Sequence, residues 1–314
     1  MAITIESAAN ALKRYAIQYA PEISTALRQD MEWENAAKWR QTYDSYVAPT
    51  ATVGELLQAY QCPITPKGSL AFDQVENRLQ RIKWDLTITC DDLEVLYGSW
   101  RADWYEIHKD AADWTFPKYF VQQMVTPKWI EEQNWNYFNG SYVAPTLNTP
   151  GTSVGSMDGL KKKIAAWILA GNIVPIITGA ITSSNIVEKV ELMNTSLPPQ
   201  LQKVKGKFYM SNTMANWFWA DYRAKYGTGN GIIGNENNEL KVDNSGKTIM
   251  GMASMEGSQR IIFCPDLIIG KRTNEPYMPA PVFRTDIRQI TMSVVYHRFI
   301  GVEHFFNLFV NDQA

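Results

Sequence analysis

The chain has 314 residues, of which 45% are hydrophobic and 20% charged, a composition typical of folded globular proteins and long enough for about two domains. Thirty basic and thirty-two acidic residues give a formal net charge of −2, which argues against a dedicated nucleic-acid-binding protein. Apolar stretches fall short of the ~20 residues of a membrane span, and residues 1–6 do not read as a signal peptide. We therefore expect synthesis in a cytoplasm and no membrane contact.

Cysteine and aromatic residues narrow the class further. The three cysteines, Cys62, Cys90 and Cys264, are isolated in the sequence, so neither a disulfide framework nor a zinc site is predicted. Eleven Trp and fifteen Tyr are a large supply of wide, rigid side chains, which are enriched at the cores of protein–protein interfaces. Ordinary core packing accounts for most of them.

The N-terminal part of the chain predicts two helices followed by an extended segment. Apolar residues spaced by three and four predict a helix within residues 1–30, and a second helix is expected at residues 29–43. The hexapeptide Ser-Tyr-Val-Ala-Pro-Thr occurs at residues 45–50 and again at 141–146. Both copies are expected to be extended, because the residue before a proline is pushed out of helical geometry.

The middle of the chain predicts a strand, a long helix and a loop. Apolar and polar residues alternate over residues 82–88, which predicts a half-buried strand that would suit a protruding β-hairpin. A helix is expected between residues 115 and 140, with Thr126 as its cap, Pro127 at its first position and Gly140 at its end. Residues 141–156 are rich in Pro, Gly, Thr and Ser and predict a loop.

The last half of the chain alternates helices and strands. Helices are expected from Asp158 to Gly171, at residues 184–194 and at residues 211–223, with a short strand at 207–210 between the last two. Residues 226–247 predict a loop rich in Gly and Asn. Three strands are then expected at 260–264, 287–296 and 302–310, with a turn at Gly301 before the last.

The sequence does not favour an enzyme motif. Gly229, Gly231 and Gly234 match the spacing of a dinucleotide-binding loop, but such a site needs a strand before it and a helix after it, so a simple loop is favoured. The histidines, His108, His297 and His304, lack metal-ligand spacing. We predict no catalytic residue, no metal and no cofactor.

One stretch keeps a carbohydrate-related function open. Residues 100–106 place Trp100 and Trp104 beside Asp103 and Glu106, and aromatic residues with paired carboxylates are typical of sugar-cleaving sites. The same spacing of acids is also common on a solvated helix face. A carbohydrate-binding or carbohydrate-active protein is therefore an alternative function.

From about residue 115 onward the order of segments resembles the major capsid proteins of tailed phages, which have the Hong Kong ninety-seven type of fold. Each motif alone is weak, and the order carries the resemblance. The first segment is the helix of residues 116–139, which ends in Tyr137-Phe138-Asn139-Gly140. The second is residues 187–202 with Leu197-Pro198-Pro199, followed by Lys207-Phe208-Tyr209-Met210-Ser211-Asn212-Thr213. The third is the loop that leads to Met250-Gly251-Met252-Ala253-Ser254-Met255 and the strand at 261–266, and the fourth is the final strands around Arg298-Phe299-Ile300-Gly301-Val302.

The resemblance implies an α+β fold with discontinuous domains. It implies an N-terminal arm (1–52), an extended loop (53–105), a peripheral domain in two parts (106–170 with a long spine helix, and 265–314) and an axial domain (171–264). Trp33 and Trp39 in the arm and Trp84 in the extended loop are candidate interface anchors, against the alternative of core packing. The loop with Gly229, Gly231 and Gly234 is expected to line the centre of each ring of subunits.

The implied function is structural. The chain would assemble with copies of itself into hexamers and pentamers of an icosahedral bacteriophage shell that encloses double-stranded DNA, as part of the virion, after assembly in the host cytoplasm. Scaffold, portal and decoration proteins are further partners that the resemblance implies, and DNA contact would be non-specific. An encapsulin-like nanocompartment shell shares this fold and is an alternative. No interchain covalent cross-link is predicted.

Overall fold

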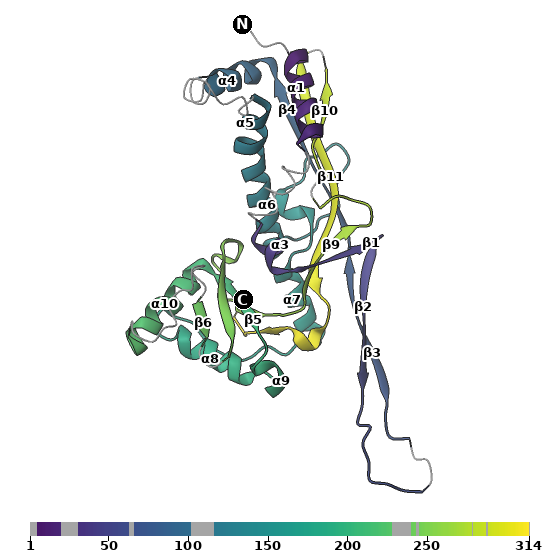
Figure 1. The fold of residues 1–314 in the computed structure, drawn as a ribbon, viewed down its shortest axis with the longest axis vertical. Coiled ribbons are helices and arrows are strands. Elements are labelled where there is room, and N and C mark those ends of the chain that lie inside the picture. The colour runs from purple at the N-terminus through teal and green to yellow at the C-terminus, as the bar shows by residue number, and fades with distance from the viewer. Residues whose placement is uncertain are drawn as a thin grey trace. The chain divides into compact units, whose positions relative to one another are not determined.

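The computed structural model describes residues 5–19, 31–62, 66–101, 116–227, 240–242, 245–277, 279–286 and 288–313. The chain divides into two units, each built from separated segments: unit 1 comprises residues 1–43, 79–162 and 269–299, and unit 2 comprises residues 44–78, 163–268 and 300–314. Figure 1 shows the elements of both units. In the described part of the chain, every helix is too short or too polar to cross a membrane.

The sheet of unit 1 is built around one long strand. β11 (Gln289–Val302) pairs with β10 (Val282–Thr285) and, over ten residues, with β4 (Gln80–Thr89). β9 (Leu267–Arg272) and β1 (Lys38–Thr42) continue the sheet on the path β1-β9-β11-β10. The expected alternation at residues 82–88 is confirmed as a strand, because Ile82 and Ile88 are buried while Lys83, Asp85 and Thr87 are exposed.

Helices pack beside this sheet in unit 1. They are α1 (Ile5–Gln18), α3 (Glu32–Ala36), α4 (Cys90–Trp100), α5 (Phe116–Tyr119), a π-helical segment (Phe120–Val125), α6 (Thr126–Asn139) and a 3-10 turn (Ser153–Ser156). α6 with its π-helical start confirms the helix expected over residues 116–139. Thr126 is not its cap, because the chain is already helical from Phe120 onward. The expected helix at 29–43 is wrong beyond Ala36, since the next residues join the sheet as β1.

Unit 2 contains a second sheet with helices. Its strand order is β12-β8-β5-β7-β6, with a parallel β5–β7 pair and antiparallel neighbours elsewhere. The strands are β5 (Gly206–Ser211), β6 (Leu240–Val242), β7 (Lys247–Met252), β8 (Ile262–Phe263) and β12 (Phe309–Val310). The helical elements are α7 (Leu160–Leu169), which begins in unit 1, α8 (Ile186–Ser196), α9 (Pro199–Gln202), α10 (Asn212–Tyr226) and 3-10 turns at Ala253–Met255 and Phe305–Asn307.

The core of unit 2 lies where α8 and α10 meet the sheet. Buried side chains there include Ile186, Val190, Phe208, Phe218 and Phe263. The start of α10 was read correctly from the sequence, because the Ser211 hydroxyl accepts from the Met214 amide at 3.2 Å and caps the helix.

One cation is fully buried in unit 2. The Lys247 ammonium donates to Asn194 Oδ1 (2.9 Å) and to the backbone oxygens of Leu201 (2.9 Å) and Gln202 (2.6 Å), and it lies 5.2 Å from the Phe263 ring centroid. Burial lowers the pKa of Lys247. Three oxygens match its three N–H donors, so this lysine fastens the turn after α8 to the sheet.

A two-stranded hairpin also belongs to unit 2. β2 (Ser45–Val53) pairs antiparallel with β3 (Leu70–Arg78), from Ser45↔Arg78 to Val53↔Leu70, and the pair forms a sheet of its own. The first copy of the repeated hexapeptide lies in β2 and is extended, as expected. The second copy, at 141–146, lies in a loop and is not part of a strand.

Four further expectations at strand level need correction. The hairpin begins at Ser45 and is formed by β2 and β3. The strand that the sequence placed in a protruding hairpin is β4, and it pairs with β11 in unit 1 instead. β11 continues through Gly301 to Val302, where a turn was expected, and residues 302–310 form a 3-10 turn and the two-residue β12 instead of one strand. The loop expected at 226–247 contains β6. The expected domain bounds remain a prediction.

Gly270 in β9 provides a test of the packing in unit 1. A Cβ atom at this position would overlap the ring of Phe299, which is fully buried on β11. Gly270→Ala is therefore expected to lower the free energy of unfolding by about 1–3 kcal/mol, measured by urea denaturation of the free subunit. Gly98→Ala is the matched control, because a Cβ in α4 meets no atom within 4 Å and alanine favours a helix by about 0.5–1 kcal/mol. Equal stability of the two variants would contradict this packing.

Candidate assembly surfaces

The far end of the β2–β3 hairpin exposes apolar side chains. Leu56 is 65% exposed, Leu57 92% and Tyr60 95%, and Leu70 at the start of β3 is exposed too. Single exposed apolar residues are ordinary, but several on one short segment make a candidate interaction surface. The group of Leu56, Leu57 and Tyr60 is called the hairpin tip below.

Polar contacts hold the chain near the hairpin tip. The Gly54 amide donates to the Ser69 carbonyl at 2.8 Å, which extends the ladder beyond Val53 and Leu70. The Lys67 ammonium contacts the Glu55 carboxylate (2.6 Å) and donates to the Leu57 carbonyl (3.3 Å). These bonds use backbone atoms and charged groups and leave the apolar side chains of the tip facing solvent.

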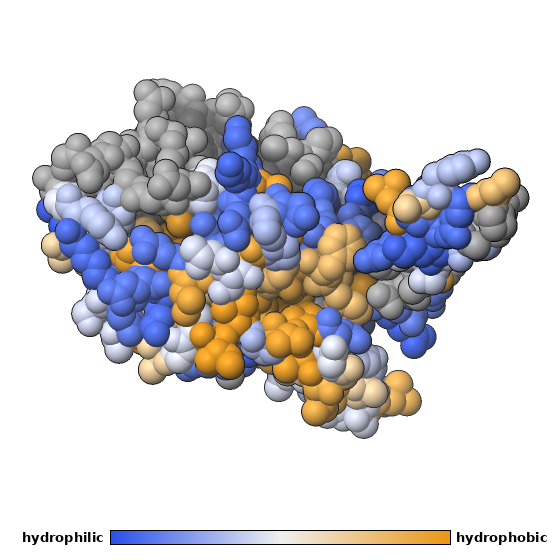
Figure 2. Space-filling view, turned by 90° about the horizontal axis from the view of Figure 1, so that it is seen from below, coloured by the Kyte–Doolittle hydropathy of each residue, from blue (hydrophilic) through white to orange (hydrophobic). Residues whose placement is uncertain are grey.

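Unit 2 exposes a second set of apolar side chains. Leu169 at the end of α7, Val174, Ile177 and Phe306 are all largely exposed. Two backbone hydrogen bonds hold the chain around Ile176 extended beside the end of β12. The Ile176 amide donates to the Val310 carbonyl, and the Asp312 amide donates to the Ile176 carbonyl. Figure 2 shows that hydrophobic residues gather in patches among hydrophilic ones on the face it presents.

The three tryptophans proposed as interface anchors lie in unit 1 in different surroundings. Trp33 on α3 is fully buried and stacks on Phe138 with ring centroids 6.2 Å apart, so core packing occupies its ring. Trp39 on β1 is half-buried, edge-on to Tyr277 at 4.9 Å. Trp84 on β4 is half-buried, 5.3 Å from the Trp129 ring centroid. An interface role remains a prediction for these residues.

Other residues singled out from the sequence fall outside the described residues. Gly229, Gly231 and Gly234 of the proposed ring-centre loop are among these, as are Asp103, Trp104, Glu106 and His108. Trp100 is described, and its ring lies 5.2 Å from that of Tyr97 and 6.2 Å from that of Phe116, within an aromatic cluster of its own unit. This packing does not favour the sugar-binding alternative.

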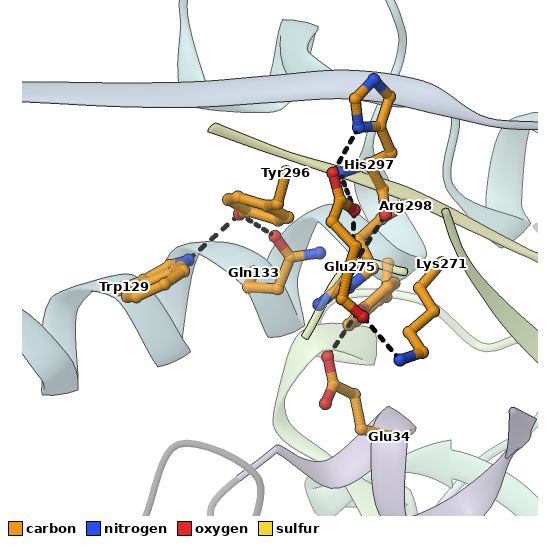
Figure 3. Close-up of polar contacts among 9 residues, drawn as sticks. Glu34, Trp129, Gln133, Lys271, Glu275, Tyr296, His297 and Arg298 are labelled. Carbon is orange, nitrogen blue, oxygen red and sulfur yellow. Dashed lines mark hydrogen bonds and ion pairs between the residues drawn. The ribbon is translucent and has the colours of Figure 1, made fainter. Parts of the chain in front are cut away.

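A polar network joins α6 to the sheet in unit 1 (Figure 3). The Trp129 indole donates to the Tyr296 hydroxyl at 3.0 Å, and that hydroxyl donates to Gln133 Oε1 at 2.6 Å. Burial raises the pKa of Tyr296 to about 12, although the hydrogen bond from Trp129 acts the other way. The phenol is therefore neutral near pH 7 and keeps the proton that it donates.

The same network continues toward α3. The Tyr137 hydroxyl donates to the buried Glu34 carboxylate at 2.7 Å, and burial together with that carboxylate raises the pKa of Tyr137 well above its usual value. On β11, His297 Nδ1 lies 2.7 Å from Glu275 Oε1, and Glu275 Oε2 accepts from the His297 amide at 3.0 Å (Figure 3). These contacts position α3, α6 and β11 against one another, so His297 has a structural partner.

The described residues give little support to a catalytic site. No three His, Cys, Asp or Glu among them lie together as a metal site requires. A cavity of about 410 Å³ in unit 1 is lined mainly by apolar residues, including Leu86, Val95 and Phe120, and by Asp92. A hydrogen bond from the Thr89 side chain lowers the pKa of Asp92, which forms a capping box with Thr89 at the start of α4.

Asp312 holds the C-terminal segment of unit 2 in place. Its Oδ1 accepts from the Thr178 amide (2.9 Å), the Thr178 hydroxyl (2.9 Å) and the Gly179 amide (3.2 Å). Burial acts to raise the pKa of Asp312, but these bonds and one from the Gln313 side chain outweigh it and hold the pKa at about 2.

Solved structures resemble this arrangement over most of its length. A chain of the satellite phage P4 procapsid with its size determination protein has a TM-score of 0.53 and 10% identity, covering 93% of this chain and 98% of that one. A capsid chain of an empty GTA particle has a TM-score of 0.55 and 12% identity, covering 90% and 89%. The chain has the fold of the tailed-phage major capsid proteins.

An encapsulin shares this fold. The SrpI encapsulin from Synechococcus elongatus PCC 7942 has a TM-score of 0.50 and 11% identity, covering 88% of this chain and 85% of that one. No protein-family model and no curated protein matches the sequence. The fold expectation, α+β of the phage capsid type, is confirmed.

The contact between Asp312 and Thr178 predicts a pH dependence. Since the pKa of Asp312 in the folded state is depressed below 3.8, the stability that its hydrogen bonds contribute is present above pH ~3.8 and is lost as the pH falls toward about 2. Asp312→Asn is expected to reduce stability at pH 7 and to lose less further stability than the wild type between pH 5 and pH 2. Thermal unfolding of the free subunit across this range measures the effect, with exposed Asp44→Asn as the control. Parallel pH profiles for wild type and Asp312→Asn would contradict the assignment.

Proposed function

We propose that this protein is a shell subunit that assembles with copies of itself into hexamers and pentamers of an icosahedral particle enclosing double-stranded DNA. The observation that carries the proposal is the β2–β3 hairpin with its exposed tip. A two-stranded ribbon has few neighbours of its own to cover apolar side chains, and apolar side chains exposed together favour association. A neighbouring copy that covers Leu56, Leu57 and Tyr60 would bury them.

The capsid fold supports the same proposal. The solved chains that it resembles come from a phage procapsid, a GTA capsid and an encapsulin complex. Contacts between unlike surfaces of identical copies form closed rings when the rotation between neighbours closes. A projecting hairpin on one copy and a different surface on the next are suited to that geometry.

The remaining partners are part of the proposal. A net charge of −2 limits repulsion among many packed copies and gives little attraction to DNA, so contact with packaged DNA would be weak and non-specific. Scaffold, portal and decoration proteins are proposed as further partners of the virion, with assembly in the host cytoplasm.

A second candidate is a nanocompartment shell that encloses protein cargo. The similarity to the SrpI encapsulin favours keeping it. Particles purified from the native source distinguish the two after nuclease treatment: protected double-stranded DNA supports the phage shell, whereas co-purified protein without DNA supports the nanocompartment.

Assembly of the recombinant protein tests the proposal. Sedimentation with negative-stain imaging is expected to show rings, tubes or closed shells for the wild type. In the double variant Leu57→Ser/Tyr60→Ser, the concentration needed for assembly is expected to rise at least about tenfold, because burying one such side chain is worth roughly 1.5–3 kcal/mol and 1.4 kcal/mol is a factor of ten. Gln61→Ser in the same loop is the control and is expected to assemble like the wild type.

A monodisperse wild-type monomer at all salt and protein concentrations, with and without lysate of the native source that could supply a scaffold, would contradict the shell function. Assembly of the double variant at the wild-type concentration would contradict the role of the hairpin tip in the interface.

A further inference from the structure

The root of the hairpin is packed against its own unit. In the register of β2 and β3, Ala48 pairs with Val75 and Tyr46 with Asn77. Ala48, Val75 and Asn77 are buried and Tyr46 is half-buried, while the intervening Val47 and Glu76 are exposed. One face of the two-stranded ribbon is therefore buried at the root. The side chains on that face include the fully buried amide of Asn77.

The buried Asn77 amide binds the end of β11 in unit 2. Its Nδ2 donates to the Val302 carbonyl at 3.0 Å, and its Oδ1 accepts from the Lys163 ammonium at 3.4 Å. The Lys163 ammonium also donates to the Ile300 carbonyl at 2.6 Å. A Cβ atom on Gly301 would overlap the Asn77 side chain, so the close approach requires glycine there.

The other strand of the hairpin, β2, contacts Glu303, the residue that follows Val302. The Tyr46 hydroxyl donates to Glu303 Oε1 at 3.3 Å, and the Glu303 amide donates to the Asp266 carbonyl at 3.1 Å. Residues 300–303 therefore receive side chains from both strands of the hairpin. Two attachment points on different strands resist rotation of the ribbon, which a single point would allow.

We propose that Asn77, Lys163 and Gly301 form a clamp that fixes the direction of the hairpin before copies meet. The clamp residues act through the hairpin as positioning residues for assembly, so this inference rests on the proposed shell function. Asn77 and Leu70 are seven residues apart on β3, which at ~3.4 Å per residue is roughly 24 Å. A tilt of about 10° at the root would displace the far end by roughly 4 Å, as large as the ~4.0–4.5 Å range of an apolar contact.

Substitution of the cation tests the clamp. Lys163→Met removes the donor to Asn77 and to Ile300 while keeping the length of the side chain, and it is expected to lower the yield of regular particles at least tenfold. Lys163→Arg keeps a cation that can donate to both oxygens and is expected to restore assembly. Lys162→Met, the same change one residue earlier on α7, is the matched control and is expected to assemble normally, because Lys162 is exposed and its partner, the half-buried Asp158, lies outside the clamp.

A distance measurement on the free subunit separates positioning from simple loss of folding. Spin labels are placed at Gln74→Cys on β3 and Gln200→Cys on α9, both exposed positions of unit 2, in a chain with Cys62 and Cys90 replaced by Ser. A narrow distribution of distances is expected in this background. The distribution is expected to broaden with Lys163→Met or Asn77→Ala added and to stay narrow with Lys162→Met added.

The outcomes distinguish the clamp from the shell function. A broad distribution in the background chain overturns the clamp even if the substituted chains fail to fold. Regular shells from Lys163→Met at the yield of the wild type also overturn it, while the shell function stands. A narrow distribution in a wild-type chain that never assembles leaves the clamp geometry intact and overturns the shell function and, with it, the role of the clamp in assembly.

Discussion

The β2–β3 hairpin is held to the rest of unit 2 at its root, where Asn77 and Tyr46 bind residues 300–303, and its far end carries exposed leucine and tyrosine side chains. A ribbon of two strands has too few neighbours to bury its apolar groups by itself. The free subunit therefore presents apolar surface in a fixed direction, and covering it requires another molecule. The assembly proposed for this chain follows from that constraint.

The rest of each unit is organised to be rigid by itself. In unit 1, the hydroxyls of Tyr137 and Tyr296 bind buried side-chain oxygens and tie α6 to α3 and to β11. In unit 2, Lys247 and Asp312 fasten two turns to the sheet through backbone groups. Buried polar groups with matched partners favour one arrangement, because any alternative leaves them unpaired. A subunit that must repeat one geometry in many copies has a use for such specificity.

Local signals were sufficient for much of the fold. The cap at Ser211, the alternation along β4 and the long helix ending at Gly140 are each encoded within a few residues, and the structure contains them. The order of the segments from residue 115 onward is enough to suggest the capsid fold from the sequence alone. The buried Trp33 and the half-buried Trp84 show the limit of composition, since aromatic residues serve cores and interfaces alike.

Features that depend on distant residues were missed. The helical spacing around Trp33 appeared to continue past Ala36, but pairing in the sheet overrides that preference and makes Lys38–Thr42 a strand. Gly301 reads as a turn, yet its lack of a side chain lets Asn77 of the hairpin approach an unbroken β11. Asn77 itself has no local signal, because its role depends on Val302 and Lys163, which are distant in sequence.

Hydrogen–deuterium exchange of the hairpin in free subunits and in sedimenting particles tests the account most directly. The amides around Ala48 and Val75 at the root are expected to be protected in both states, because the subunit itself buries them. Amides of residues 55–62 at the far end are expected to exchange quickly in the free subunit and to become protected in the particle. Unchanged rapid exchange of residues 55–62 after assembly would contradict the claim that another copy covers the hairpin tip.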